Sequence, residues 1–172
     1  MTRFQSLSPG TKWLVARTGV IPSLMKKYIP LDVRKVLDEV LGQNDRAAIS
    51  VGSAMIEHEL EGYLAVRLRV PKTNKERQDL FTENGIFGSF STKIKGAYYM
   101  NLIGPLTRSN LDLIRDIRNQ VSHDMNPVSF QHTAAISDKC GRLDLTGLVR
   151  TQTSPLTLPA KRFKAAVLHY MT

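Results

Sequence analysis

The sequence predicts an all-α fold, a single-domain bundle of antiparallel helices with irregular, basic N-terminal and C-terminal flanks. Apolar residues recur at three- and four-residue steps through most of the chain, which is the repeat of amphipathic helices. Glycine and proline separate these periodic runs, as expected at helix ends. With 172 residues, 42% of them hydrophobic and 23% charged, the chain is long enough to form one domain with its own core.

Residues 1–30 are predicted to form an N-terminal arm, and residues 31–172 a single helical domain. Prolines and glycines at five positions of the arm break any long helix, so short helical pieces are expected there. Residues 31–41 predict the first full helix, because their apolar side chains share one face and Gly42 can serve as the C-cap.

The longest periodic run begins at Asn44 or Asp45, either of which can be the N-cap, and continues to about Arg69, just before Pro71. On a helical wheel this run has one polar face and one broad apolar face. Glu59 lies in the middle of the apolar face, where an isolated charge is costly, so it is expected to pair with a basic residue of a neighbouring helix. The predicted solvent face comprises Arg46, Ser50, Ser53, Glu57 and Glu61, and the predicted core face comprises Ala48, Ile49, Gly52, Met55, Ile56, Tyr63 and Val66.

Two helices are predicted in the second half of the domain. The first covers residues 90–103, with Ser89 as its N-cap and Gly104-Pro105 as its end. The second begins after Ser109 and ends before Pro127. Its predicted core stripe consists of Leu111, Ile114, Ile117 and Val121.

The remaining segments give weaker patterns. Leu80-Phe81 begins a short apolar segment that ends at the turn signal Asn84-Gly85. Residues 134–145 are mixed, and residues 151–159 are rich in Thr, Ser and Pro, which predicts a loop. A last helix is expected from Pro159 or Ala160, because proline suits the first helical turn.

The net charge of +9 is concentrated at the two ends of the chain. Residues 1–43 carry seven Lys/Arg and three Asp/Glu, residues 44–130 eleven and ten, and residues 131–172 six and two, which gives +4, +1 and +4. Basic flanks are typical of chains that meet phosphate backbones or, less often, an anionic membrane surface, although a basic soluble protein would show the same excess.

The composition predicts a cytoplasmic protein that does not enter the membrane. No signal-like segment is present at the N-terminus, and no stretch approaches the roughly 20 apolar residues of a membrane span. The single cysteine, Cys140, cannot form an internal disulfide, which fits a reducing compartment. No metal-ligand spacing and no glycine-rich phosphate loop occurs, so neither a metal nor another cofactor is expected.

The candidate chemistry is concentrated in residues 114–124, where Arg118 is followed five positions later by His123. Five residues on an ideal helix place the two side chains about 140° apart, so they could act together only if the helix frays near Ser122 or if a second subunit completes the site. In a structural alternative, Arg118 pairs with Glu59, and a protonated His123 interacts favourably with the negative, C-terminal end of the helix dipole. The candidate binding residues are Arg115, Arg118, His123, Lys93 and Lys95.

Residues 81–103, with a glycine turn, a Ser-x-x-x-Lys helix start and the pair Ala97-Tyr98, resemble the mannitol operon repressor family. Residues 44–48 and 117–119, His123 and the region around Cys140 add to a resemblance that covers roughly residues 35–145. Gly85-Ile86-Phe87 and Met100-Asn101 depart from the family pattern, which favours a divergent branch.

This resemblance implies an all-helical transcriptional regulator without a recognised DNA-binding motif, which acts through a protein partner or as a homodimer. Whether the chain also contacts nucleic acid directly is left open by the resemblance. The hairpin of residues 97–121 superficially resembles a helix-turn-helix, but Asp112 and Asp116 near the start of its second helix disfavour insertion into a DNA groove.

A second, local resemblance concerns Arg118-Asn119, a three-residue spacer and His123, which are similar to the motif of HEPN domains. Those helical proteins often dimerise, and some are metal-independent ribonucleases, found for example in toxin-antitoxin pairs. The resemblance implies that Arg118 would hold the scissile phosphate and that His123 would act as general acid or base, with Asn119 beside them. Structural, binding and catalytic roles for these residues are all left open by the sequence.

Overall fold

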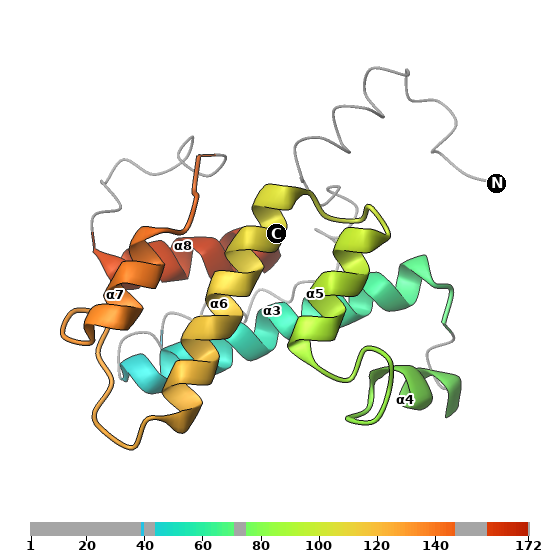
Figure 1. Ribbon diagram of the computed structural model, residues 1–172, viewed down its shortest axis with the longest axis horizontal. Coiled ribbons are helices and arrows are strands. Elements are labelled where there is room, and N and C mark those ends of the chain that lie inside the picture. The colour runs from blue at the N-terminus through green and yellow to red at the C-terminus, as the bar shows by residue number, and fades with distance from the viewer. Residues whose placement is uncertain (1–38, 40–43, 71–74, 147–157, 172) are drawn as a thin grey trace.

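The computed structural model describes residue 39 and residues 44–70, 75–146 and 158–171. Within these residues the chain forms six helices and no strand, which confirms the predicted all-α class (Figure 1). The helices are α3 (Asp45–Arg67), α4 (Lys75–Phe81), α5 (Phe90–Tyr99), α6 (Pro105–His123), α7 (Ala134–Gly141) and α8 (Pro159–Met171). The predicted arm of residues 1–30, most of the predicted helix of residues 31–41 and the predicted loop up to residue 157 lie outside the described residues.

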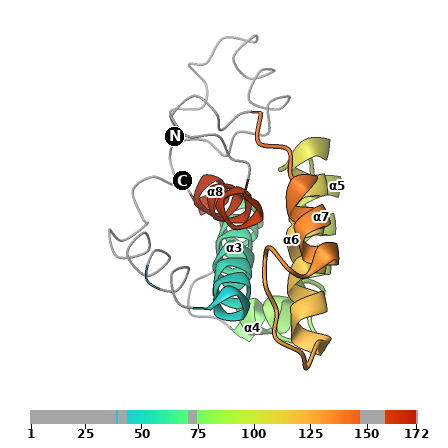
Figure 2. The ribbon, with the colours of Figure 1, turned by 90° about the vertical axis from the view of Figure 1, so that its left-hand side faces the viewer.

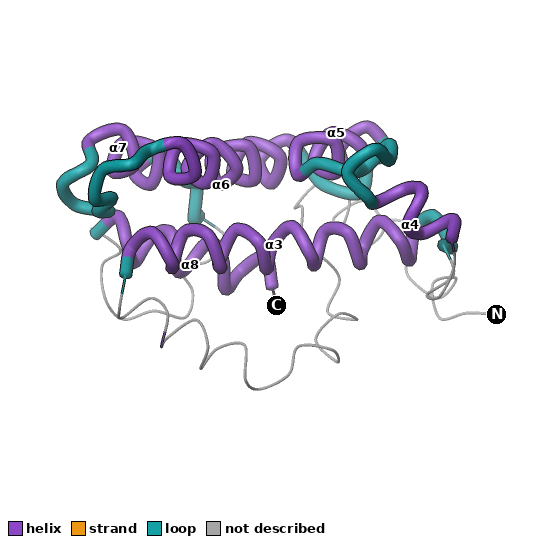
Figure 3. Tube along the Cα trace, turned by 90° about the horizontal axis from the view of Figure 1, so that it is seen from below, coloured by secondary structure: helices purple, strands orange, loops and turns teal. Residues whose placement is uncertain are grey.

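The helices are arranged in two layers. Helices α5, α6 and α7 form one layer and α3 and α8 the other, while α4 lies at one end beside the start of α5 (Figures 2 and 3). Helices α5 and α6 form an antiparallel hairpin, as expected for a bundle. In contrast, α3 and α8 run parallel. Gly52 of α3 faces Phe163 and Val167 of α8, and two turns further along α3, Leu60 lies near Tyr170.

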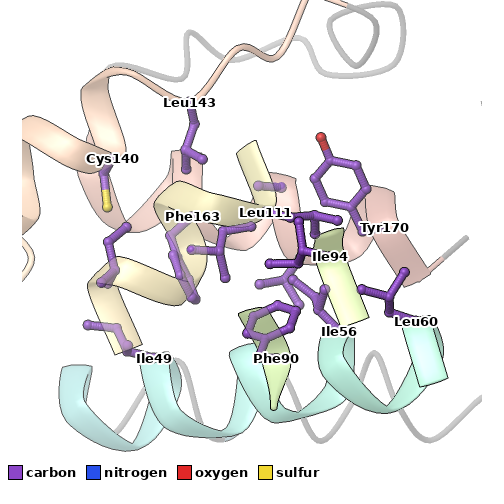
Figure 4. Packing of buried hydrophobic residues seen from close by; sticks show 14 of the residues in the cluster. Ile49, Ile56, Leu60, Phe90, Ile94, Leu111, Cys140, Leu143, Phe163 and Tyr170 are labelled. Carbon is purple, nitrogen blue, oxygen red and sulfur yellow. The ribbon is translucent and has the colours of Figure 1, made fainter. Parts of the chain in front are cut away.

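The hydrophobic core lies between the two layers (Figure 4). Phe130 and Phe163 are the largest fully buried side chains, and their ring centroids are 5.5 Å apart. Each helix from α3 to α8 contributes at least one buried apolar residue to this one cluster. The apolar stripe predicted for α6 is confirmed, since Leu111, Ile114, Ile117 and Val121 are all buried.

Helix α3 is the central element, and its burial differs from the prediction. Its start is as predicted: the Asn44 side chain accepts a hydrogen bond from the backbone N–H of Arg46 at 2.8 Å. However, Ser53 of the predicted solvent face is completely buried, whereas Val66 of the predicted core face is 71% exposed. The reason is that α3 contacts α8, α5 and α6, so that part of its polar face is also covered, although Ser50 stays exposed.

Helix α5 begins as predicted but ends early. Ser89 and Thr92 form a reciprocal capping box, in which each backbone N–H donates to the other residue's hydroxyl at 3.1 Å. The helix ends at Tyr99, not at Ile103, because Asn101 adopts a left-handed backbone conformation with φ of 54°.

The predicted start of α6 after Ser109 is wrong. Gly104 is the N-cap and Pro105 is the first helical residue. Proline has no backbone N–H to donate and its fixed φ suits the first helical turn, so Pro105 begins this helix as well as following the previous one. The start of α8 at Pro159 is confirmed.

Two shorter helices complete the described part of the chain. Helix α4 begins in a polar part of the chain for which the sequence predicted no helix, and its last residue, Phe81, stacks on Phe87 with ring centroids 5.8 Å apart. Helix α7 lies within the mixed segment of residues 134–145. Among the described residues, no helix combines the length and the hydropathy that crossing a membrane requires.

Candidate functional site

Acidic and basic side chains form an alternating ion-pair network where α3 meets α4, α5 and α6. Arg118 donates to Glu57 at 2.7 Å, and the other oxygen of Glu57 accepts from Lys93 at 3.1 Å. Lys93 also lies 3.2 Å from Glu61, whose second oxygen pairs with Arg77 at 3.0 Å. The network therefore carries three positive and two negative charges, and it joins four helices.

Lys93 is the centre of this network and the most deeply buried charged residue in it. Its side chain is only 6% exposed, while the Glu57 and Glu61 side chains are 17% and 20% exposed. A buried ammonium group needs carboxylate partners of this kind, because leaving it unpaired costs on the order of 3–5 kcal/mol. Lys93, which the sequence offered as a binding residue, is thus a structural residue at the α3 and α5 contact.

Arg118 is paired with Glu57 and not with Glu59, which corrects the predicted partner. Two residues along a helix differ by about 200°, so the side chains of Glu57 and Glu59 leave α3 in nearly opposite directions. Glu59 instead lines a small cavity of about 20 Å³ beside Tyr63 and Tyr170. Among the described residues it has no hydrogen-bond or ion-pair partner, and its partial exposure allows hydration of the carboxylate.

His123 and Asn119 are both exposed and lie near the C-terminal end of α6. The helix does not fray at Ser122, because α6 continues to His123. Arg46 holds this end: its guanidinium donates to the backbone carbonyls of Val121, Asp124 and Asn126 at 2.5 to 2.7 Å. Arg118 and His123 therefore point to different sides of an intact helix, and one chain does not bring them to a common point.

Arg115 and Lys95, the other predicted binding residues, lie on the outer side of the α5 and α6 layer. Arg115 pairs with Asp112 at 2.6 Å and with Asp116 at 2.7 Å, and it reaches Ser91 of α5 at 3.3 Å. Lys95 is exposed. Arg115 therefore holds both acids of α6 in place, and Lys95 is available to a partner.

A polar hollow of about 420 Å³ opens on the same outer side, between α5, α6 and the end of α7. Tyr98, Arg108 and Arg142 line it together with Asp112 and Asp116. The Arg108 guanidinium carbon lies 4.4 Å from the centroid of the Tyr98 ring, in a cation–π contact. Sequence reasoning missed this group. The Tyr98-Tyr99 pair ahead of a Gly-Pro turn and an arginine was the available signal.

Cys140 is completely buried and offers no nucleophile. Burial raises the pKa of its thiol from 9.0 to about 12, against a smaller opposing effect of Arg162, so the thiolate is scarce near neutral pH. The part of the chain that the structure describes contains no group of three or more His, Cys, Asp or Glu residues placed to hold a metal ion.

Comparisons of the chain with protein-family models, with curated proteins and with solved structures found no match. The chemistry of the site is therefore inferred from its own geometry.

Proposed function

We propose that this chain is a non-catalytic regulatory module of the mannitol-operon-repressor type, which acts in the cytoplasm through protein partners. The observation that carries the proposal is the 2.7 Å hydrogen bond from Arg118 to Glu57. Arg118 is the residue that a HEPN-type ribonuclease would need for the scissile phosphate, and here its guanidinium binds a carboxylate of the same chain. Arg118 thus serves to join α6 to α3.

Two further observations support a module that works by contact. The likeness of residues 81–103 to the mannitol operon repressor family supports the regulatory class. Val66 and Met125 are 71% and 98% exposed, which supplies apolar side chains for a protein partner. The nearly neutral middle of the sequence also disfavours the continuous phosphate-binding face that a DNA duplex requires.

His123→Ala is the sharpest test of the proposal. His123 is exposed at a helix end, so its replacement is expected to leave the fold and the thermal midpoint nearly unchanged. Cells that produce the variant should show the same transcript changes as cells that produce the wild type, relative to a deletion strain. Loss of those changes by a folded variant at equal abundance, together with an RNA-cleaving activity that the purified wild type has and the variant lacks, would contradict a non-catalytic role.

The alternative is a HEPN-like protein that binds or cleaves RNA without a metal. It is favoured by the exposure of Asn119 and His123 and by the 37% exposure that the Arg118 side chain retains. Because the intact helix separates Arg118 from His123, this alternative requires a second subunit to complete the site. It predicts RNA cleavage by the purified wild type, loss of cleavage in His123→Ala, and retention in Glu57→Gln, which removes the carboxylate charge that pairs with Arg118.

Direct repression through DNA has its own test. A protein that reads an operator should bind that DNA more tightly than random DNA, and its affinity should fall as salt rises. The proposed module is expected to show no preference between the two DNAs, while its regulatory effect persists in cells.

A further inference from the structure

We propose that the polar hollow between α5, α6 and the end of α7 binds a nucleotide unit of single-stranded RNA. This inference goes beyond the regulatory role proposed above and uses different residues from the Arg118 network, so either can fail alone. The hollow, of about 420 Å³, has the size of sites that take small organic molecules. A nucleotide would present a flat base, ribose hydroxyls and a phosphate to it.

The side chains that would receive the base are already stacked. The Arg108 guanidinium carbon lies 4.4 Å from the Tyr98 ring centroid and 5.7 Å from that of Tyr99. The two tyrosine rings meet edge to face with their centroids 5.5 Å apart, and Tyr99 is 71% exposed. Tyrosine rings and arginine planes are the groups on which unpaired bases stack. This platform consists of Tyr98 and Arg108, which line the hollow, and of Tyr99, which is not a lining residue but lies beside them.

Two guanidinium groups of the hollow remain available to a phosphate. The nearest carboxylate oxygens to Arg108 and Arg142 are both 3.7 Å away, in Asp112 and Asp138, which exceeds hydrogen-bond distance. The Arg142 side chain is also 65% exposed. Arginine binds phosphate through paired N–H donors, so these groups could hold the backbone beside the stacked base.

Two carboxylates in the hollow favour a single strand over a duplex. Asp112 and Asp116, both held by Arg115, can accept hydrogen bonds from a ribose 2′-hydroxyl or from base amino groups. The same carboxylates would repel the dense phosphates of a duplex, whose base faces are also hidden by stacking. An apolar peptide fits less well, because the hollow is open and contains charges of both signs.

The test is fluorescence anisotropy of the full chain with four probes: a labelled 12-nucleotide RNA, the DNA of the same sequence, the RNA duplex and a labelled mononucleotide. The single-stranded RNA should bind most tightly, the DNA more weakly and the duplex weakest. The mononucleotide should bind more weakly than the 12-nucleotide RNA, since a single unit makes fewer phosphate contacts. Equal or tighter binding of the duplex would overturn the proposal.

Substitutions test whether the RNA binds at the hollow. Tyr99→Ala and Arg108→Lys should each weaken RNA binding by about tenfold, because each removes a stacking surface. Ile86→Ala and Arg67→Lys are matched controls, since Ile86 is as exposed as Tyr99 and Arg67 ends a different helix. Arg142→Ala should lower the slope of log affinity against log salt by about 0.7, the value for one phosphate contact to a single strand.

Circular dichroism and the thermal midpoint check that every variant is folded. If Tyr99→Ala and Arg108→Lys bind RNA like their controls, the hollow is not the site and the proposal is wrong. The proposal is also wrong if the wild type binds no single-stranded RNA. If Tyr99→Ala then dissociates a self-associated form, this face is a protein interface.

Discussion

Arg118 of α6 donates a hydrogen bond to Glu57 of α3 at 2.7 Å, although 61 positions separate the two residues in the sequence. The second oxygen of Glu57 accepts from Lys93 of α5, so that one carboxylate joins three helices. A position that a helical wheel assigns to solvent thus holds the two layers together.

Lys93→Ala should lower the free energy of unfolding by about 2 kcal/mol. The variant leaves Glu57 and Glu61 close together without the ammonium group between them, and removal of one partner from a buried pair is costly. The loss should stay below the largest such values, because Arg118 and Arg77 still pair with the two carboxylates. Urea unfolding measures the change.

Lys95→Ala provides the control for this variant. Lys95 lies on the same helix but is exposed, so its replacement should change the free energy of unfolding by less than about 0.5 kcal/mol. Equal effects of the two replacements would mean that the network does not stabilise the fold.

Asn110→Ala should cost about 2–3 kcal/mol. The Asn110 amide is 2% exposed, donates to the Asp144 carbonyl at 2.7 Å and to the Tyr170 hydroxyl at 2.8 Å, and accepts from the Asp144 N–H at 2.9 Å. The variant leaves the Asp144 backbone groups and the Tyr170 hydroxyl without their hydrogen-bond partner inside the protein, so the cost of removing these groups from water is no longer offset. Asn119→Ala, an exposed position on the same helix, should be nearly neutral in the same unfolding experiment.

Cys140 should make the protein less stable as the pH rises above about 9. Burial raises the pKa of this thiol from 9.0 to about 12, so between these values the unfolded chain loses a proton that the native chain keeps. The free energy of unfolding should fall there by about 1.4 kcal/mol per pH unit from this group. Below pH 9 both states hold the proton and its contribution is constant.

Cys140→Ala should remove that part of the slope. The test compares urea unfolding of wild type and variant from pH 8 to 10.5. Burial also raises the pKa of Tyr170, but this effect is common to both proteins and cancels in the difference. Parallel stability curves for the two proteins would show that Cys140 ionises normally in the native state.

Two glycines in helices should respond to alanine in opposite ways. A Cβ at Gly62 of α3 would meet no atom within 4 Å, so Gly62→Ala should raise the free energy of unfolding by about 0.5–1 kcal/mol. A Cβ at Gly96 of α5 would come within 2.3 Å of the Phe87 ring, so Gly96→Ala should lower it by about 1–3 kcal/mol. Thermal or urea unfolding measures both changes. A stabilising Gly96→Ala would show that the position of the Phe87 ring does not require a glycine at residue 96.

Much of the fold could be predicted because helix starts depend on nearby residues. Asn44, Ser89 and Pro159 each act on the first turn that follows them, and the helices begin where these residues predict. The errors also have local causes. Asn101 ends α5 through a left-handed conformation that the sequence only permits, and Pro105 can either stop one helix or begin the next.

The candidate site was less predictable. Arg118, His123 and Lys93 were all identified from the sequence, but Glu57 and Glu61, the partners of Arg118 and Lys93, were not. The Tyr98 and Arg108 stack was missed because it forms across the α5–α6 turn, between residues ten positions apart. A wheel describes one helix at a time and contains no information about a neighbouring helix.

The sequence by itself determined that the chain is helical, where three of the six described helices begin and which face of α6 is buried, since caps and apolar periodicity act within a few residues. Only the tertiary structure decided that part of the polar face of α3 is covered and that Glu57, not Glu59, pairs with Arg118. The physical reason is that burial and ion pairing depend on distances between helices, which hydrophobic packing sets once the whole domain has folded.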